Sequence, residues 1–229
     1  MLQARQYVKL VLEQNTTMNL TGATSEDEAF QLHIEDSLAL LPILDAITKQ
    51  QIASRQEDAT LLRSILDVGS GGGLPGVILA IARPDWQVTL LDSLRKRCIF
   101  VEKATKAVGV QNTHVVWARA EEAGQSQQHR EVYDIAVARA VAKMRVLAEL
   151  CPPFVKPGGH WLAAKGPDCE AEVMAAENAI HILQGGPPSI SPVNAFGSSG
   201  QHMAVVVEKL AATPPQYPRH PGKPSKRPL

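Results

Sequence analysis

After residue 60, short apolar runs alternate with longer segments in which apolar residues recur at helical spacing. The short runs predict strands buried on both faces, and the longer segments predict the helices that cover them. The predicted strands span 64–68, 87–91, 113–117, 133–138 and 160–164, with two late strands near 189–194 and 202–210. The predicted helices span 75–82, 94–108, 143–150 and 168–182, and a loop is expected at 120–122. This alternation predicts an α/β fold with a mostly parallel sheet that is covered on both faces.

The region before the alternation reads as helical. Its expected elements are helices over 2–13 and 25–46, a break at 15–24 and a polar loop at 49–58. Ser25 and Glu28 have the spacing of a capping box, which favours a helix that starts at this point. The chain would then consist of a helical extension at 1–62, a core at 63–210 and a basic, proline-rich tail at 211–229.

Prolines and glycines mark two further features. The prolines of the tail favour an extended strap over a helix. Pro157-Gly158-Gly159 predicts a turn just before the fifth strand of the core.

Composition limits the class of protein. With 229 residues, of which 45% are hydrophobic, the chain can bury a substantial core as one domain. It has no run approaching the roughly 18 apolar residues of a membrane span and no secretory signal, so we expect a cytoplasmic protein without a membrane partner. Cys98, Cys151 and Cys169 are odd in number and lack metal-ligand spacing, which predicts reduced thiols and no metal site.

The formal net charge is zero, but the basic residues are clustered. One cluster contains Arg95, Lys96, Arg97, Lys103 and Lys106, and the other contains Arg219, Lys223, Lys226 and Arg227. Charge alone is equally consistent with solvated surfaces and with binding of a polyanion. Aromatic residues make up only 4% of the chain, and none interleaves with the basic ones. A base-stacking sheet is therefore not expected.

The segment SILDVGSGGGLPG at 64–76 joins an apolar strand to a helix through a loop with five glycines. A chain places that many glycines in one turn where its backbone passes close to a ligand. A phosphate loop would need a Lys followed by Ser or Thr, and the segment has neither. A dinucleotide fingerprint can be read from Gly71 onward, so a nicotinamide cofactor stays open. Asp67 ends the strand where it could receive a cationic amine, and S-adenosylmethionine carries such an amine.

A second acid, Asp92, ends the next strand. An acid at this position suits the vicinal hydroxyls of a ribose, in dehydrogenases and methyltransferases alike. Asp92 could also cap the helix that begins at Leu94, and the two roles are compatible.

An ordered set of motifs runs through nearly the whole chain. It contains Asn15 with Asn19-Leu20-Thr21, His33 with Asp36-Ser37, Asp67-Val68-Gly69-Ser70-Gly71 through Leu74-Pro75-Gly76, and Leu91-Asp92-Ser93 with Lys96-Arg97. It continues with Arg119-Ala120-Glu121-Glu122, Ala138-Arg139-Ala140, Thr213-Pro214 and Tyr217-Pro218-Arg219. Each piece alone is weak, but the ordered set resembles the small-subunit ribosomal RNA guanine-N7 methyltransferases, a family of Rossmann-like class I enzymes that depend on S-adenosylmethionine. The resemblance implies a mostly parallel, seven-stranded sheet in which the two late strands form a final antiparallel pair.

The resemblance implies methyl transfer from S-adenosylmethionine to N7 of one guanine in the decoding-region loop of 16S ribosomal RNA, giving 7-methylguanosine. The partner would be 16S rRNA, in the small ribosomal subunit or its precursor, and the enzyme would act as a monomer. The cofactor-binding residues carried over by motif, with those argued above, are Asp67, Gly69, Gly71, Leu74, Asp92, Ala120, Glu121 and Arg139. The candidate RNA-binding residues are Arg95, Lys96, Arg97, Lys165, Arg219, Lys223, Lys226 and Arg227. They suggest a groove between the 95–106 helix and the tail, with affinity that falls steeply with salt.

Guanine N7 carries a lone pair and no proton, so the transfer needs no general base. No catalytic residue is therefore expected, and the protein would act by positioning the base in line with the methyl group. Arg139 could hold the methionine carboxylate or an RNA phosphate, or it could form a structural ion pair with Asp134 or Glu149. His33 and Asp36 lie three residues apart, and we interpret them as an intrahelical pair.

Other classes stay open. A nicotinamide-dependent oxidoreductase would use the same loop and Asp92, but the sequence offers no set of hydride-transfer residues. A non-enzymatic RNA-binding factor would keep the basic tail and have no need for five glycines. A methyltransferase with a different RNA or small-molecule acceptor is the third alternative.

Overall fold

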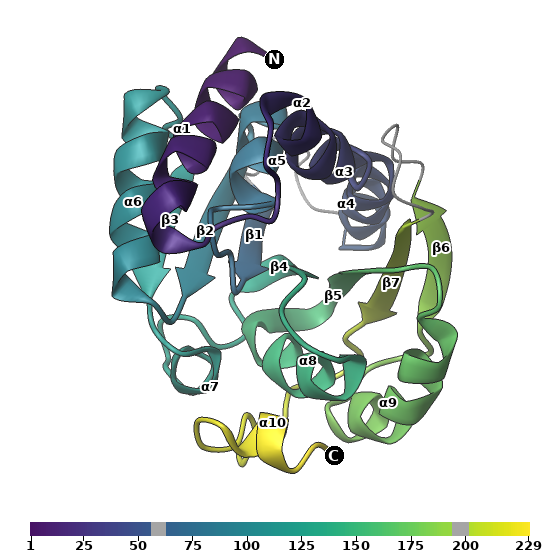
Figure 1. Ribbon diagram of the computed structural model, residues 1–229. Helices are drawn as coiled ribbons and strands as arrows, with labels where there is room; N and C mark the ends of the chain where they lie inside the picture. The colour runs from purple at the N-terminus through teal and green to yellow at the C-terminus, as the bar shows by residue number, and fades with distance from the viewer. Residues whose placement is uncertain (56–62, 194–201) are drawn as a thin grey trace.

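We describe residues 1–55, 63–193 and 202–229 of a computed structural model of the chain. Their centre is a seven-stranded sheet in the order β3-β2-β1-β4-β5-β7-β6 (Figure 1). The parallel strands are β1 (Arg63–Val68), β2 (Trp86–Asp92), β3 (Thr113–Trp117), β4 (Tyr133–Arg139) and β5 (Val155–Lys165). The antiparallel end is formed by β7 (His202–Glu208) and β6 (Ser189–Val193). The predicted α/β architecture and strand pairing are confirmed.

Helices cover the sheet on both faces, and the alternation of buried residues along β1 shows why. Ile65 belongs to a hydrophobic cluster on one face, and Leu66 belongs to a second cluster on the other. The first face is covered by α1 (Leu2–Met18), α4 (Leu41–Arg55), α5 (Gly76–Ala82) and α6 (Arg95–Ala107). The second is covered by α7 (Ala120–Ala123), α8 (Met144–Leu150) and α9 (Glu170–Ile182). Cys98, Cys151 and Cys169 are buried free thiols, as predicted.

The strand order reverses at β1, which pairs with β2 on one side and with β4 on the other. At such a switch point the connections leave the sheet in opposite directions and open a crevice beyond the carboxyl ends of the strands. The glycine-rich loop begins here, directly after Val68.

The N-terminal extension is helical, but its boundaries differ from the prediction. Helix α1 continues to Met18, and Asn19 ends it in the left-handed conformation. The predicted single helix at 25–46 is divided into α2 (Glu26–Ala29), a π-helical turn η1 (Phe30–Glu35), α3 (Asp36–Leu38) and the start of α4. The capping box is confirmed, since Ser25 Oγ accepts a hydrogen bond from Glu28 N–H at 3.2 Å.

Three loop predictions were wrong. Helix α4 runs to Arg55, so the predicted loop at 49–58 is helical as far as the described residues reach. Pro157-Gly158-Gly159 lies inside β5, where the register with β4 shifts, because such an irregularity tolerates a residue without a backbone donor. Residues 120–123 form the short helix α7. Asn194, predicted to end a strand, lies outside the described residues.

The C-terminal tail packs against the core rather than running as an extended strap. It includes a helical turn, α10 (Lys223–Lys226), and lies beside α7 and α8 in Figure 1. Arg130 donates hydrogen bonds to the carbonyl oxygens of Thr213, Pro214 and Tyr217. Within the described parts of the chain, none of the helices has the length and apolar character that crossing a membrane requires.

Candidate functional site

The glycine-rich loop after β1 is held against the neighbouring strand. The N–H groups of Gly69 and Ser70 donate to the carbonyl oxygen of Leu91 at 2.8 and 2.9 Å. Gly76 is required by close packing, because an added Cβ would lie 2.3 Å from a methyl carbon of Leu90. Gly71 has a φ of +58°, and an added Cβ would meet no atom closer than 4.0 Å. The space above Gly71 is therefore open to a ligand.

Asp67 lies beneath this loop rather than on the cavity wall. Its Oδ2 accepts a hydrogen bond from Gly76 N–H at 2.8 Å, whereas its buried Oδ1 has no partner among the described residues. Burial raises the pKa of Asp67 to about 7, with Asp92 adding to the effect and Gly76 N–H and Arg139 opposing it. A cationic group close to the loop would relieve this unpartnered carboxylate, which fits the amine of S-adenosylmethionine.

The helix-capping role predicted for Asp92 was wrong, because α6 begins at Arg95 with Leu94 as its N-cap residue and without a side-chain cap. Asp92 instead supports the turn before α6 and the glycine-rich loop. Its Oδ1 accepts from Leu94 N–H at 2.8 Å, and its Oδ2 accepts from Gly71 N–H at 2.9 Å. Arg97 Nη1 lies 3.8 Å from the same Oδ2 and contributes an ion pair. The carboxylate thus joins the end of β2, the start of α6 and the glycine-rich loop.

Ala120 and Glu121 lie at the far side of β2, after β3. The Glu121 carboxylate is buried and accepts hydrogen bonds from Arg119 and from the N–H of Gly222 in the tail, the latter at 2.8 Å. Burial raises the pKa of Glu121, but these donors outweigh burial and hold it below its usual value. The side chain is therefore engaged in joining α7 to the tail, and a cofactor contact at this position would use the backbone.

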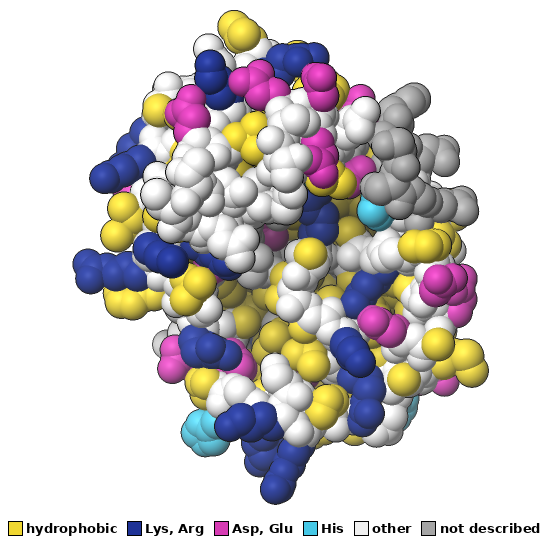
Figure 2. All heavy atoms as spheres, in the orientation of Figure 1, with side chains coloured by type: hydrophobic (Ala, Val, Ile, Leu, Met, Phe, Trp, Pro, Cys, Tyr) yellow, Lys and Arg dark blue, Asp and Glu magenta, His cyan; other side chains and the backbone are white. Residues whose placement is uncertain are grey.

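A cavity of about 580 Å³ opens beside the loop, and Figure 2 shows the hollow in the middle of this face with basic side chains around it. Gly69, Gly71, Leu74 and Arg139 line it, together with Arg97 and Lys165. Asp67, Asp92, Ala120 and Glu121 are outside this lining. The structure thus brings four of the eight predicted cofactor residues into one cavity and places the others beneath or beside it.

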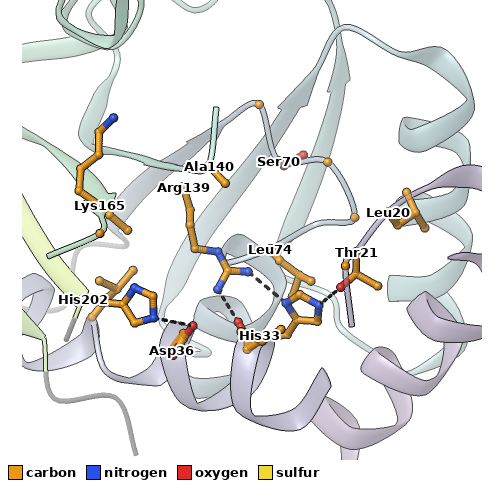
Figure 3. Close-up of a pocket in the computed structure, with 18 of the residues that line it drawn as sticks. Leu20, Thr21, His33, Asp36, Ser70, Leu74, Arg139, Ala140, Lys165 and His202 are labelled. Atoms are coloured by element: carbon orange, nitrogen blue, oxygen red, sulfur yellow. Dashed lines mark hydrogen bonds and ion pairs between the residues drawn. The ribbon is translucent and has the colours of Figure 1, made fainter. Parts of the chain in front are cut away.

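Arg139 ends β4 and points into the cavity toward the N-terminal segment (Figure 3). Its guanidinium donates to Leu32 O at 2.9 Å and lies 3.4 Å from His33 Nδ1. The predicted ion pairs with Asp134 and Glu149 were wrong, because Lys156 pairs with Asp134 and Arg219 pairs with Glu149. Arg139 instead ties the extension to the sheet.

The predicted pair of His33 and Asp36 was also wrong, since the π-helical turn directs them to different partners. His33 Nε2 is 2.5 Å from Thr21 Oγ1, and burial, with Arg139 nearby, lowers the pKa of His33 to about 4. Asp36 Oδ2 lies 3.5 Å from Nε2 of His202, at the start of β7. Both contacts are visible in Figure 3.

The candidate RNA-binding residues differ in their exposure and in whether their charges are already paired. Arg95, Lys96, Lys223, Lys226 and Arg227 are exposed. Arg97 is partly buried, and its Nη2 donates to Asn19 O. Arg219 and Lys165 are occupied: Arg219 forms a bidentate pair with the fully buried Glu149, and Lys165 Nζ is 2.7 Å from Glu172. Figure 3 shows Lys165 extending away from Asp36 and Arg139.

An aromatic residue accompanies the basic cluster, contrary to the expectation from sequence. Trp117 ends the edge strand β3 with 57% of its surface exposed, and Arg95 Cζ lies 5.1 Å from its ring centroid. The two residues are far apart in sequence, so the proximity was invisible in the linear pattern. The tryptophan at the end of the predicted strand 113–117 was the available signal.

Sequence reasoning missed the residues that connect the extension to the site. Tyr7 Oη donates to Gly72 O at 2.8 Å. A Cβ added on Gly73 would lie 2.2 Å from the same Tyr7 Oη. Asn15 Oδ1 accepts from the N–H groups of Leu20 and Thr21, which hold the segment that forms one wall of the cavity. Asn15 was part of the resemblance, but its role was not assigned.

Comparisons with known proteins agree with this architecture. Among solved structures, a putative O-methyltransferase from Klebsiella pneumoniae superimposes with a TM-score of 0.56 over 90% of each chain, at 14% identity. A variant of a 16S rRNA adenine-N1-methyltransferase from Catenulisporales acidiphilia, solved with S-adenosylmethionine, superimposes with a TM-score of 0.53 over 74% of this chain and 92% of that one, at 17% identity. At these identities the likeness shows the class I methyltransferase fold.

Sequence relatives are far closer. Proteins named ribosomal RNA small subunit methyltransferase G from Alkaliphilus metalliredigens and Moorella thermoacetica are 41% and 39% identical to the chain. Each alignment covers 97% of this chain and 88% of the relative. The family model GidB, described as rRNA small subunit methyltransferase G, matches residues 1–196. The chain therefore belongs to the rRNA small subunit methyltransferase G family, whose enzymes depend on S-adenosylmethionine.

Proposed function

We propose that this protein transfers the methyl group of S-adenosylmethionine to N7 of a guanine in the decoding-region loop of 16S ribosomal RNA. The observation that carries the proposal is the cavity at the switch point of a class I fold, with an open glycine in its lining and a partly unsatisfied buried carboxylate beneath the glycine-rich loop. We place the enzyme in the cytoplasm, as a monomer acting on the small subunit or its precursor.

The bound cofactor supplies a methyl group activated by a sulfonium. Gly69 and Gly71 let the backbone approach it, and Leu74 provides an apolar contact in the cavity wall. Asp92 holds Gly71 in place and offers an acid to the ribose, while the backbone at Ala120 and Glu121 borders the adenine end. Asp67 contributes a negative charge beneath the loop, opposite a cationic amine.

Arg139 has the chemistry to bind an anion. It lines the cavity and makes no ion pair at 4.0 Å or less with a described residue, so its charge is available to the methionine carboxylate or to an RNA phosphate. Its hydrogen bond to Leu32 fixes the guanidinium before a ligand arrives, which reduces the entropy cost of binding.

The proposed reaction asks the protein for position rather than for proton transfer. Guanine N7 presents a lone pair without a proton, so no side chain has to act as a base. The rigid loop and the packed extension hold the two reactants at a fixed separation, which is the main contribution expected of such a site.

The RNA surface that we propose combines Arg95, Lys96 and Arg97 with the exposed Trp117, and it continues to Lys223, Lys226 and Arg227 of the tail. Basic side chains neutralise phosphates, and an exposed indole offers a face to an unstacked base. We assign Arg97, Lys165 and Arg219 a smaller part, because their charges are already paired with acids.

Calorimetry separates this proposal from a nicotinamide enzyme. The purified protein is titrated with S-adenosylhomocysteine and with NAD, and Arg139→Ala is titrated in parallel. We expect the protein to bind S-adenosylhomocysteine and not NAD. The affinity of Arg139→Ala for S-adenosylhomocysteine should be lower by about tenfold or more, because a charged contact is lost. Binding of NAD alone would contradict the proposed function.

A further inference from the structure

Asp36 occupies the half of the cavity that the proposed cofactor contacts leave free. Those contacts lie at the carboxyl ends of β1, β2 and β3, apart from Arg139. Asp36 lies at the start of α3, directly after the π-helical turn, near residues from the ends of β5 and β7 (Figure 3). Because the proposed cofactor contacts occupy the other half, this half is the part of the cavity that is left for a methyl acceptor. π-Helical turns are frequent where a fold presents side chains to a ligand.

Asp36 is the only acid among the described residues that line the cavity. Its 3.5 Å contact with His202 is its one ion pair among those residues, and no side-chain hydrogen bond to its carboxylate is formed there. That contact is longer than a normal hydrogen bond, so both oxygens keep capacity to accept. Burial raises the pKa of Asp36, and the nearby His202 and Arg139 oppose that effect. The site therefore presents a carboxylate with free acceptor capacity.

We propose that Asp36 selects guanine as the target base by accepting hydrogen bonds from its N1–H and its exocyclic N2 amino group. The inference deepens the proposed function and rests on it. Guanine is the only standard base with two adjacent donors on its Watson–Crick edge, and one carboxylate can accept both. Adenine, cytosine and uracil each place an acceptor in that pair of positions, which the carboxylate repels.

The same contact leaves the reactive atom accessible. N7 lies on the Hoogsteen edge of the purine, opposite the N2 amino group. A base held by Asp36 at its Watson–Crick edge thus turns N7 away from α3, toward the part of the cavity bordered by the glycine-rich loop. One side chain therefore sets both the identity of the base and the direction of its nucleophile.

The test replaces the target guanosine with inosine, which lacks only the N2 amino group and keeps N1–H and N7. Small subunits are reconstituted with 16S rRNA ligated from fragments that carry either nucleoside at the methylated position. We expect wild-type kcat/KM to be at least about tenfold lower on inosine, because the carboxylate loses a charge-assisted hydrogen bond.

Asp36→Ala should lower kcat/KM on guanosine and should treat guanosine and inosine alike, within about twofold. Asp36→Asn keeps the shape of the side chain but sets one amide donor against the base, and we expect a similar loss of discrimination. Both variants should bind S-adenosylhomocysteine as the wild type does. Asp27→Ala, at an exposed acid of α2, is the matched control and should keep the wild-type ratio.

Two results would overturn the inference: equal rates of the wild type on both substrates, or undiminished discrimination in a folded Asp36→Asn variant. Transfer to neither substrate by a wild type that binds the cofactor is a different outcome. It would remove the proposed function, and the inference with it.

Discussion

Asp92 is a residue on which we expect the proposed cofactor site to depend. Asp92→Ala removes the acceptors of Gly71 N–H and Leu94 N–H. It also removes the acid that we propose for the ribose. Each charged hydrogen bond contributes about 1.5–3 kcal/mol, so we expect affinity for S-adenosylhomocysteine to fall at least about tenfold. Calorimetry measures this, with the exposed Asp85→Ala as control. Unchanged affinity would remove Asp92 from the site.

We expect Asp67 to make cofactor binding depend on pH. Its pKa of about 7 lies above the usual value of a carboxyl, so the free protein holds a proton there below pH 7. A cationic amine favours the ionised form, so binding releases that proton and affinity rises as pH increases toward 7, then levels off. Calorimetric titrations with S-adenosylhomocysteine at pH 6, in buffers of different ionisation enthalpy, should show the release of this proton. Asp67→Asn should show none, and an absent release in the wild type would contradict the role.

Local sequence revealed some site residues and not others. Asp67, Asp92 and the glycines follow apolar strands directly, so strand ends alone located them. The partners of Arg139 and Asp36 come from elements far along the chain, which no local pattern specifies. Helical spacing suggested that His33 would face Asp36, but the π-helical turn changed the angle between them.

At the scale of elements, α1 packs against the glycine-rich loop and supports it. Tyr7 is fully buried, and its hydroxyl bonds to Gly72 O. Tyr7→Phe leaves that carbonyl oxygen without its partner, so we expect a loss of about 1–2 kcal/mol in stability and weaker cofactor binding. Chemical denaturation and calorimetry measure the two effects. Tyr217→Phe, at a tyrosine of the tail, is the control. Equal effects in both variants would contradict the role of α1 in supporting the loop.

We expect Arg219 of the tail to contribute to the stability of the fold. Arg219→Ala leaves the fully buried Glu149 without its ion pair, which should destabilise the protein by about 3 kcal/mol or more. Lys226→Ala, at an exposed tail residue, should leave the melting temperature unchanged. If Arg219→Ala melts like the wild type and loses only RNA affinity, Arg219 belongs to the RNA surface instead.

Elements with strong local signals were predicted well, since each core strand is a compact apolar run. The N-terminal helices, the start of β5 and the tail were not, because packing against the sheet decides their form. Pro157 would end a strand in isolation, but it is accommodated at a register shift against β4. The tail's prolines favoured an extended chain, whereas contacts with Arg130 and Glu149 fold it onto the core. The division of the chain at residues 62 and 210 stays a prediction.

At the scale of the whole molecule, the sheet, the N-terminal extension and the tail all contribute residues around the switch point of the sheet. The sheet supplies the loop and Arg139, the extension supplies Asp36 and Tyr7, and the tail anchors α7 through Glu121. A net charge of zero does not exclude an RNA substrate here, because exposed basic residues gather near Trp117 and in the tail.

The most direct test of this account is to map the methylated nucleotide. The purified protein and methyl-labelled S-adenosylmethionine are incubated with small ribosomal subunits that lack this modification, and the rRNA is analysed by nuclease digestion and mass spectrometry. The account predicts a single 7-methylguanosine in the decoding-region loop of 16S rRNA. Label on another atom or nucleotide, or no label from protein that binds the cofactor, would contradict it.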